Sequence, residues 1–203
     1  MITQRWIRCR VVSGLVALAL CIVPARMLAG QGAAASREQA DDAAAFKEFS
    51  ARLQEYVKLQ KTVQSSLPTL RATDLPEMIA AHQQALARKI REARPNAKPG
   101  DIFTSAACEA FRHASRAVLE GPSSAQSRAY MQKDAPNPAL RLTVNGVYPG
   151  TEPIMAPPPE LLAALPPLPA EVAYRVVGRT LIIVDVESRL VVDIARHILP
   201  PAS

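Results

Sequence analysis

Three histidines are the side chains of this chain best suited to bind a metal ion. His82, His113 and His197 lie on separate predicted elements, and none has another histidine or a cysteine three or four residues away. A metal site on one helix or loop needs ligands at such short spacings. The spacing therefore defines no metal site, and we interpret each histidine as a surface or partly buried side chain.

Paired carboxylates are the usual groups for acid–base chemistry. Asp185 and Asp193 lie on the last two predicted strands, where they can approach each other across the hairpin. Acids near strand ends are more commonly solvated or paired with a neighbour, here Arg175 or Arg189. We adopt that interpretation and assign them no chemistry.

The sequence contains no catalytic motif that we can identify. It lacks the nucleophile elbow G-x-S-x-G, the phosphate loop G-x-x-x-x-G-K-[ST], the zinc motif H-E-x-x-H and a dinucleotide glycine fingerprint. It also has only eight glycines, which leaves little material for a phosphate cradle. We therefore predict a non-catalytic protein, with no catalytic, cofactor-binding or metal-binding residue assigned.

A group of basic residues lies in the second and third predicted helices and in the loop between them. Such a cluster can bind an anionic polymer or lipid headgroups. No aromatic side chains are interleaved with it, as a nucleic-acid groove requires, so we favour a solvated helix face and expect no nucleic-acid partner. The group comprises Arg88, Lys89, Arg91, Arg94, Lys98, Arg112 and Arg116.

Residues 1–30 have the pattern of an export signal. Three arginines precede the apolar run Val11 to Val23, and small residues follow it. As a helix this run covers roughly 20 Å, which is too short for the ~30 Å hydrocarbon core of a bilayer. We predict cleavage near Ala29 or Ala35, a periplasmic or secreted protein, and no permanent membrane span after processing.

Cleavage of the signal changes the charge and the cysteine content. Removal of its four arginines lowers the net charge from +6 to +2. Cys108 is then the single thiol, so no intramolecular disulfide can form. We interpret Cys108 as a small buried hydrophobe on a helix. The alternative is an intermolecular disulfide or a reactive thiol.

A helical region is predicted over residues 36–133. Its first helix, 36–67, carries large apolar side chains at heptad spacing, with Gln60 at one apolar position. This seam packs within the molecule or, alternatively, against a second copy as a coiled coil. The seam consists of Phe46, Phe49, Leu53, Tyr56, Val63 and Leu67.

Two further helices follow in this region. Asp74 as N-cap, Pro76 in the first turn and Glu77 predict the start of the second helix, which ends near Arg94. The third helix is predicted from 105 to 120, with Gly121 as a left-handed stop. The apolar stripe of the second helix is Ile79, Leu86, Ile90 and Ala93.

Residues 134–170 form a predicted proline-rich connector, since ten of the eighteen prolines fall between Pro136 and Pro169. Proline favours extended structure over helix. Within the connector, Asn145-Gly146 predicts a hairpin turn between short strands, and 160–165 predicts one helical turn. The connector acts as a stiff spacer or, alternatively, as a docking site for an aromatic groove.

Residues 171–199 predict a three-stranded antiparallel β-meander with strands 172–177, 180–186 and 190–194. The middle strand is apolar on both faces, so both need cover. The helices can cover one face, and the connector or another subunit must cover the other. The chain as a whole is predicted to be α+β, with an N-terminal layer of about three helices, a proline-rich connector and a C-terminal meander.

The C-terminal third resembles the C-terminal module of RcnB-type periplasmic proteins, a family associated with nickel and cobalt homeostasis. The similarity covers about thirty of the 203 residues, and the helical part resembles exported bacterial proteins that are uncharacterised. The resemblance implies a periplasmic location and, as an alternative function, metal homeostasis. The matching segments are Leu165 to Pro169, Tyr174 to Gly178, Leu181 to Asp185 and Leu190 to Asp193.

Taken together, these patterns predict an exported, non-catalytic interaction or structural module of the cell envelope. The apolar seam and the doubly apolar middle strand predict a partner, either an envelope protein or a second copy of the chain.

Overall fold

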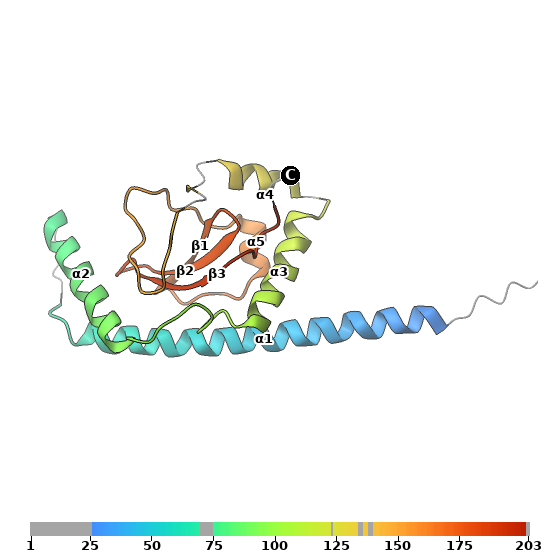
Figure 1. The fold of residues 1–203 in the computed structure, drawn as a ribbon, viewed down its shortest axis with the longest axis horizontal. Helices are drawn as coiled ribbons and strands as arrows, with labels where there is room; N and C mark the ends of the chain where they lie inside the picture. Colours follow the sequence, from blue (N-terminus) through green and yellow to red (C-terminus); the bar gives the residue numbers. More distant parts are fainter. Residues whose placement is uncertain (1–25, 70–74, 123, 134–135, 138–139, 202–203) are drawn as a thin grey trace, which may run out of the picture.

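The computed structural model describes residues 26–69, 75–122, 124–133, 136–137 and 140–201. Most of the predicted export signal and the predicted N-cap Asp74 therefore lie outside the described residues. The fold is α+β, as predicted (Figure 1). Its elements are α1 (Arg26–Ser65), α2 (Pro76–Ala93), α3 (Ser105–Leu119), α4 (Ser124–Gln132), α5 (Pro159–Ala164), β1 (Val172–Val177), β2 (Thr180–Asp185) and β3 (Val191–Ala195).

Helix α1 is the long element along one side of the molecule, and the sheet lies over part of its length (Figure 1). It begins ten residues before the predicted Ser36, and both predicted cleavage positions lie within it. Its seam packs inside the molecule, because Phe49, Leu53 and Tyr56 are buried in the main core. The coiled-coil alternative is therefore not needed to cover these three side chains.

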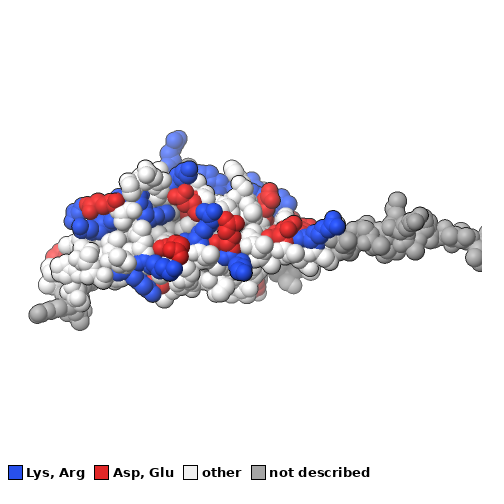
Figure 2. Space-filling view, turned by 90° about the horizontal axis from the view of Figure 1, so that it is seen from below, with Lys and Arg blue, Asp and Glu red and all other residues white. Residues whose placement is uncertain are grey.

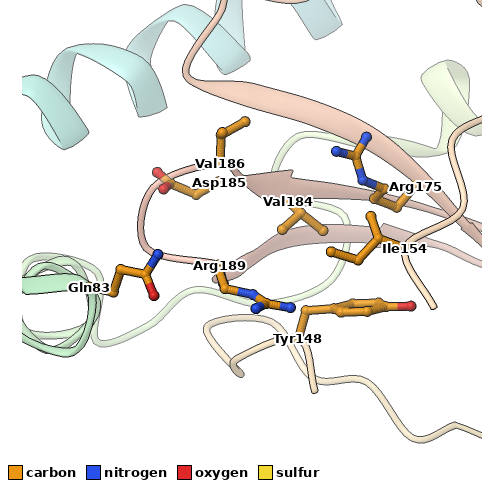
Figure 3. Close-up of a pocket in the computed structure, with 8 residues that line it drawn as sticks. All are labelled: Gln83, Tyr148, Ile154, Arg175, Val184, Asp185, Val186 and Arg189. Carbon is orange, nitrogen blue, oxygen red and sulfur yellow. The ribbon is translucent and has the colours of Figure 1, made fainter. Parts of the chain in front are cut away.

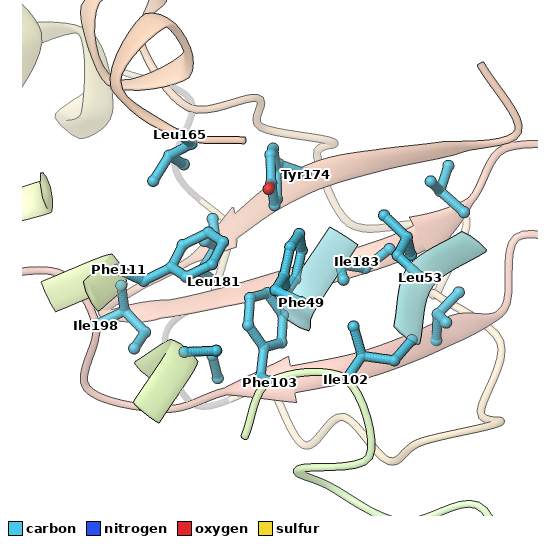
Figure 4. Packing of buried hydrophobic residues seen from close by; sticks show 14 of the residues in the cluster. Phe49, Leu53, Ile102, Phe103, Phe111, Leu165, Tyr174, Leu181, Ile183 and Ile198 are labelled. Carbon is cyan, nitrogen blue, oxygen red and sulfur yellow. The ribbon is translucent and has the colours of Figure 1, made fainter. Parts of the chain in front are cut away.

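The main core lies between α1, α3 and one face of the sheet (Figure 4). Aromatic rings occupy its centre: the ring centroid of Phe49 lies 4.9 Å from that of Phe111 and 5.2 Å from that of Phe103. Leu181 and Ile183 of β2 meet this cluster from the sheet. The burial of several large aromatic and aliphatic side chains here makes this layer the main source of hydrophobic stabilisation.

The sheet has the strand order β1-β2-β3 with antiparallel neighbours, as predicted. Val172 lies opposite Asp185 in the β1–β2 pair, and Ile183 lies opposite Asp193 in the β2–β3 pair. An irregularity in the pairing falls between Ile183 and Val184. Local antiparallel pairing of β-branched segments separated by short turns explains why the sequence located these strands well.

The connector covers part of the second face of the sheet. Leu142 and Tyr148 pack there against Ile182 and Ile194 in a smaller cluster. The predicted hairpin is wrong in one respect. The turn at Asn145 forms, but the amide that follows at Tyr148 donates to Arg189 O at 2.9 Å instead of pairing with residues 140–144.

The reason is that β3 would otherwise be an open edge. Asn145 N donates to Val191 O, and Val191 N donates to Gly146 O, both at 2.8 Å. The short segment thus satisfies main-chain groups of the last strand, which an isolated local hairpin would leave exposed.

Helix α2 ends as predicted, with Arg94 as its C-cap, but differs from the prediction at its start. Its N-cap position is Leu75, whose side chain makes no capping hydrogen bond, and Pro76 is the first helical residue. Leu86 and Ile90 are buried as expected, but Ile79 and Ala93 are exposed. The apolar stripe therefore packs only in the second half of the helix.

The remaining helices show two correct predictions and two differences. Helix α3 spans nearly the predicted range, and Thr104 Oγ1 caps it by accepting from Ala107 N at 3.2 Å. Gly121 is not the left-handed stop, because only Gly100 and Gly178 among the described glycines have positive φ. Helix α4 was not predicted, and α5 is the helical turn expected in the connector.

Candidate binding groove

A groove of about 330 Å³ lies at the end of the sheet where β2 turns into β3 (Figure 3). We call it the turn groove. Its walls come from α2, from two positions in the connector, from β1 and from the β2–β3 turn. The lining side chains are Gln83, Tyr148, Ile154, Arg175, Val184, Asp185, Val186 and Arg189.

The floor of the turn groove is apolar. Val184 lies at its centre, with Val186 and Ile154 on opposite sides (Figure 3). Val186 is 54% exposed and Ile154 is 53% exposed, so the connector leaves this part of the second sheet face open. An accessible apolar floor with a few polar groups around it is the usual composition of a ligand site.

Two guanidinium groups flank this floor. Arg175 projects from β1, and its Nη1 donates to Tyr174 O at 2.7 Å. Arg189 follows the turn with φ of 58°, and its side chain extends toward the ring of Tyr148 (Figure 3). Burial lowers the pKa of Arg175, because it disfavours the charged form.

Tyr148 anchors the connector side of the turn groove. Its hydroxyl donates to Pro153 O at 2.7 Å. Burial, and then the negative charge of Glu152, raise the pKa of Tyr148, while Arg175 and Arg189 act in the opposite direction. The hydroxyl is therefore a neutral donor at ordinary pH and not an activated nucleophile.

Asp185 lines the turn groove but is not available as a base. It is 0% exposed, and its Oδ2 accepts from Tyr56 Oη at 2.8 Å. Its Oδ1 accepts from Glu187 N at 3.1 Å and from Ser188 N at 2.7 Å. The prediction of a solvated or arginine-paired acid is wrong, because this carboxylate fastens the β2–β3 turn to α1.

Asp193 is likewise buried and not solvated. Its Oδ2 accepts from the amides of Ile102 and Phe103, both at 2.7 Å, and its Oδ1 accepts from Gly100 N at 3.0 Å and Ile194 N at 2.7 Å. We call this arrangement the Asp193 clasp. It joins β3 to the loop before α3 and leaves no lone-pair direction for a substrate.

The three histidines lie apart, as the spacing predicts. His82 Nε2 lies 3.1 Å from Glu187 Oε1, and Glu187 Oε2 also accepts from Gln64. His113 Nδ1 lies 3.0 Å from Asp42 Oδ2 and 3.3 Å from Glu38 Oε1. His197 is exposed. Within the described ranges, no group of three or more His, Cys, Asp or Glu side chains is arranged to hold a metal ion.

Cys108 is half-buried on α3 and packs against the main core. Its Sγ lies 3.5 Å from Phe103 O. Burial raises the pKa of the thiol, with Arg112 acting in the opposite direction and Asp193 in the same one. This environment fits the interpretation as a small hydrophobe, and the intermolecular disulfide stays an untested alternative.

The predicted basic group is in part structural. Arg91 Nε donates to Asn145 O at 2.9 Å, and the Arg94 guanidinium lies 4.9 Å from the ring centroid of Tyr56. Both therefore help to hold the connector and α1 and are not simply solvated. On the face seen in Figure 2, blue and red side chains are interspersed and form no patch of one sign.

The turn groove could not be located from the sequence. Arg175 and Arg189 were noted only as neighbours of acids, and Tyr148 and Ile154 belong to the proline-rich connector. The one usable signal was the apolar run of β2, which continues to Val186 on the second face.

The described helices include none that combines the length and apolarity needed to cross a membrane.

Comparison with protein-family models, with curated proteins and with solved structures finds no match for this chain. The similarity to RcnB-type proteins therefore stays a prediction from the C-terminal residues alone.

Proposed function

We propose that this protein is an exported, non-catalytic interaction module of the cell envelope that binds a partner in the turn groove. Export rests on the arginine-led apolar pattern of residues 1–30. The binding role rests on the open part of the second sheet face. The groove supplies an apolar floor and fixed donors, while its one carboxylate and one hydroxyl are already engaged.

The observation that carries the proposal is the exposure of Val186 and Ile154 beside Val184. Elsewhere the same face is buried by Leu142 and Tyr148. Isolated exposed apolar residues are ordinary. Val186 and Ile154, however, line the same groove as Val184, so the three side chains form one apolar surface. Ile79, itself exposed, is one turn before Gln83 on α2 and extends this surface along the same helix face.

Site-specific crosslinking tests the binding role. A photoreactive amino acid placed at Val186 in the exported full chain should crosslink one defined envelope protein in intact cells of the source organism. The matched control is Tyr130 on α4, which is 45% exposed and does not line the turn groove. Identical products from both positions, or none from Val186, would contradict the proposal.

The export half has its own test. The mature protein, isolated from the envelope fraction, should begin near Ala29 or Ala35. A chain that retains its initiator methionine and fractionates with cytoplasmic components would contradict export while leaving the groove untouched.

Metal homeostasis is the alternative that the C-terminal resemblance implies. Among the described residues, His113 on α3 lies near two carboxylates of α1, Asp42 and Glu38, and these are side chains of the types that bind metal ions. The same geometry is also explained as a simple polar contact between α1 and α3. A melting temperature that rises with nickel or cobalt, and falls back with a chelator, would favour this alternative. An unmoved melting temperature would count against it.

A further inference from the structure

We propose that the occupant of the turn groove is an extended peptide segment of a partner protein whose groove-facing side chains, at every second residue, are alternately carboxylates and aliphatic groups. Arg175 and Arg189 would bind the carboxylates, and Val184 and Val186 would contact the aliphatic groups. This inference deepens the proposed function and rests on it.

The first argument is charge. Neither Arg175 nor Arg189 forms an ion pair with any residue in the described part of the chain. Asp185 in the groove wall is taken up by Tyr56 and the turn amides, and Glu152, whose charge raises the pKa of Tyr148, accepts from Asn137 N at 3.1 Å through its Oε2. The groove therefore presents two cations without a bound carboxylate, and planar guanidinium groups bind carboxylates in a bidentate manner.

The second argument is the apolar floor between the two cations. A simple anion would satisfy the guanidinium groups and leave Val184, Val186 and Ile154 in contact with water. A ligand that also carries aliphatic side chains covers them. The volume of about 330 Å³ admits a few side chains and no large domain. In an extended peptide every second side chain points to the same face, so carboxylates and aliphatic groups two residues apart can face the groove together.

The third argument is the backbone at Arg189. Its amide donates to Asp185 O at 3.0 Å, and Asp185 N donates to Leu190 O at 2.9 Å, so the turn closes without the arginine side chain. The φ of 58° is one that glycine or asparagine adopts more readily than arginine does. Local folding therefore does not require arginine here, and a substitution can separate binding from folding.

The matched variants follow from this turn. Arg189→Asn removes the charge and keeps a residue suited to positive φ. Arg196→Asn removes an equal charge from an exposed position after β3, at the end of the sheet opposite the turn. Arg175→Gln removes the second cation and keeps a donor for Tyr174 O.

The probes are short labelled peptides in which every second residue is alternately glutamate and valine or leucine, with serine at the positions between, together with the same peptides carrying glutamine in place of glutamate. Binding to the full mature chain is measured by fluorescence anisotropy up to about 1 mM peptide. We expect the acidic peptides to bind, with resonances of residues 184–189 shifting in NMR spectra. Arg189→Asn and Arg175→Gln should each weaken binding about tenfold or more, and Arg196→Asn by less than about twofold.

Three outcomes would overturn the inference: no binding by any acidic peptide, equal binding by the glutamine peptides, or equal loss in Arg196→Asn. Melting curves of all three variants show whether each is folded, and Arg189→Asn should melt no lower than the unchanged protein. Crosslinking from Val186 to a defined partner without acidic-peptide binding would leave the proposed function standing and remove only this ligand. Loss of both would remove the two together.

Discussion

At the scale of residues, the most informative side chains are the two buried aspartates of the sheet. Each was a candidate for chemistry by type, and each instead accepts several hydrogen bonds, at least one of them from a part of the chain far away in sequence. Asp185 meets α1 through Tyr56, and Asp193 meets the loop before α3. A carboxylate whose oxygens accept several hydrogen bonds is held in one orientation and ties together the segments that donate to it.

The Asp193 clasp predicts a large loss of stability on substitution. Asp193→Asn places an amide donor against backbone N–H groups that are themselves donors, so we expect the free energy of unfolding to fall by about 3 kcal/mol. Urea denaturation followed by circular dichroism measures the change. Asp41→Asn, at an exposed position on α1, is the control and should change the free energy by less than about 0.5 kcal/mol.

Gln60 predicts a change in the opposite direction. It occupies an apolar position of the α1 seam and is 1% exposed, and its Oε1 has no hydrogen-bond partner in the described structure. Gln60→Leu removes this unsatisfied acceptor and should raise the free energy of unfolding by about 1 kcal/mol. Gln54→Leu, at an exposed position of the same helix, should give no comparable gain. A loss in Gln60→Leu would show that the amide is needed.

At the scale of elements, the structure shows which sequence signals could be read locally. The three strands and α3 were placed within one or two residues, because β-branched runs between turns and a capped apolar helix are patterns of neighbouring residues. The bounds of helix α2 were also placed within one or two residues, but only half of its predicted apolar stripe is buried. Ile79 has the spacing of a buried residue, but the first turn of the helix is exposed and only the later turns pack on the core. Whether a turn reaches the core depends on the tertiary arrangement and not on the local sequence.

The start of α2 supplies a prediction about local stability. Leu75 occupies the N-cap position without a capping side chain, and the following turn is exposed. Leu75→Asp supplies a side-chain acceptor and a charge suited to the helix N-terminus, which we expect to stabilise the turn by about 1 kcal/mol. Amide hydrogen exchange over residues 76–82 should slow about fivefold. Leu75→Ala is the control and should not slow it.

The connector shows why the candidate groove could not be predicted. Its Asn145-Gly146 signal was correct for a turn, yet the partner strand is β3, about 45 residues later in the sequence. The turn groove in turn needs α2, the connector, β1 and the β2–β3 turn to meet in space. The spacing of residues within one segment does not show which distant segments lie together. The residues that line the groove therefore share no pattern in the sequence.

At the scale of the whole molecule, buried tyrosines join the layers. Tyr56 links α1 to the β2–β3 turn, and Tyr174 Oη donates to Pro166 O at 3.1 Å, which links β1 to the connector. Burial raises the pKa of both phenols above 10.0, and the charge of Asp185 raises that of Tyr56 further. These contacts require the protonated phenol.

This predicts that the protein loses stability in alkali. Below about pH 10 both the folded and the unfolded chain keep these protons, so their contribution is fully present. Above that pH the unfolded chain releases them first, and the folded state loses stability with each further rise. Urea midpoints measured from about pH 8 to about pH 11 should fall at the upper end. In Tyr174→Phe the fall should be smaller, and an equal fall would contradict the assignment.

The bond between Tyr56 and Asp185 also has a consequence for the order of synthesis. A ribosome makes the α1 seam more than one hundred residues before the strand that completes its burial, which begins at Val172. At about 5–20 residues per second, the interval lasts roughly ten seconds. During that time the apolar seam of α1 in the nascent chain cannot be buried against the sheet. A factor that holds the emerging polypeptide unfolded would therefore have its target in the region of Phe49 to Val57, well before the last strand exists.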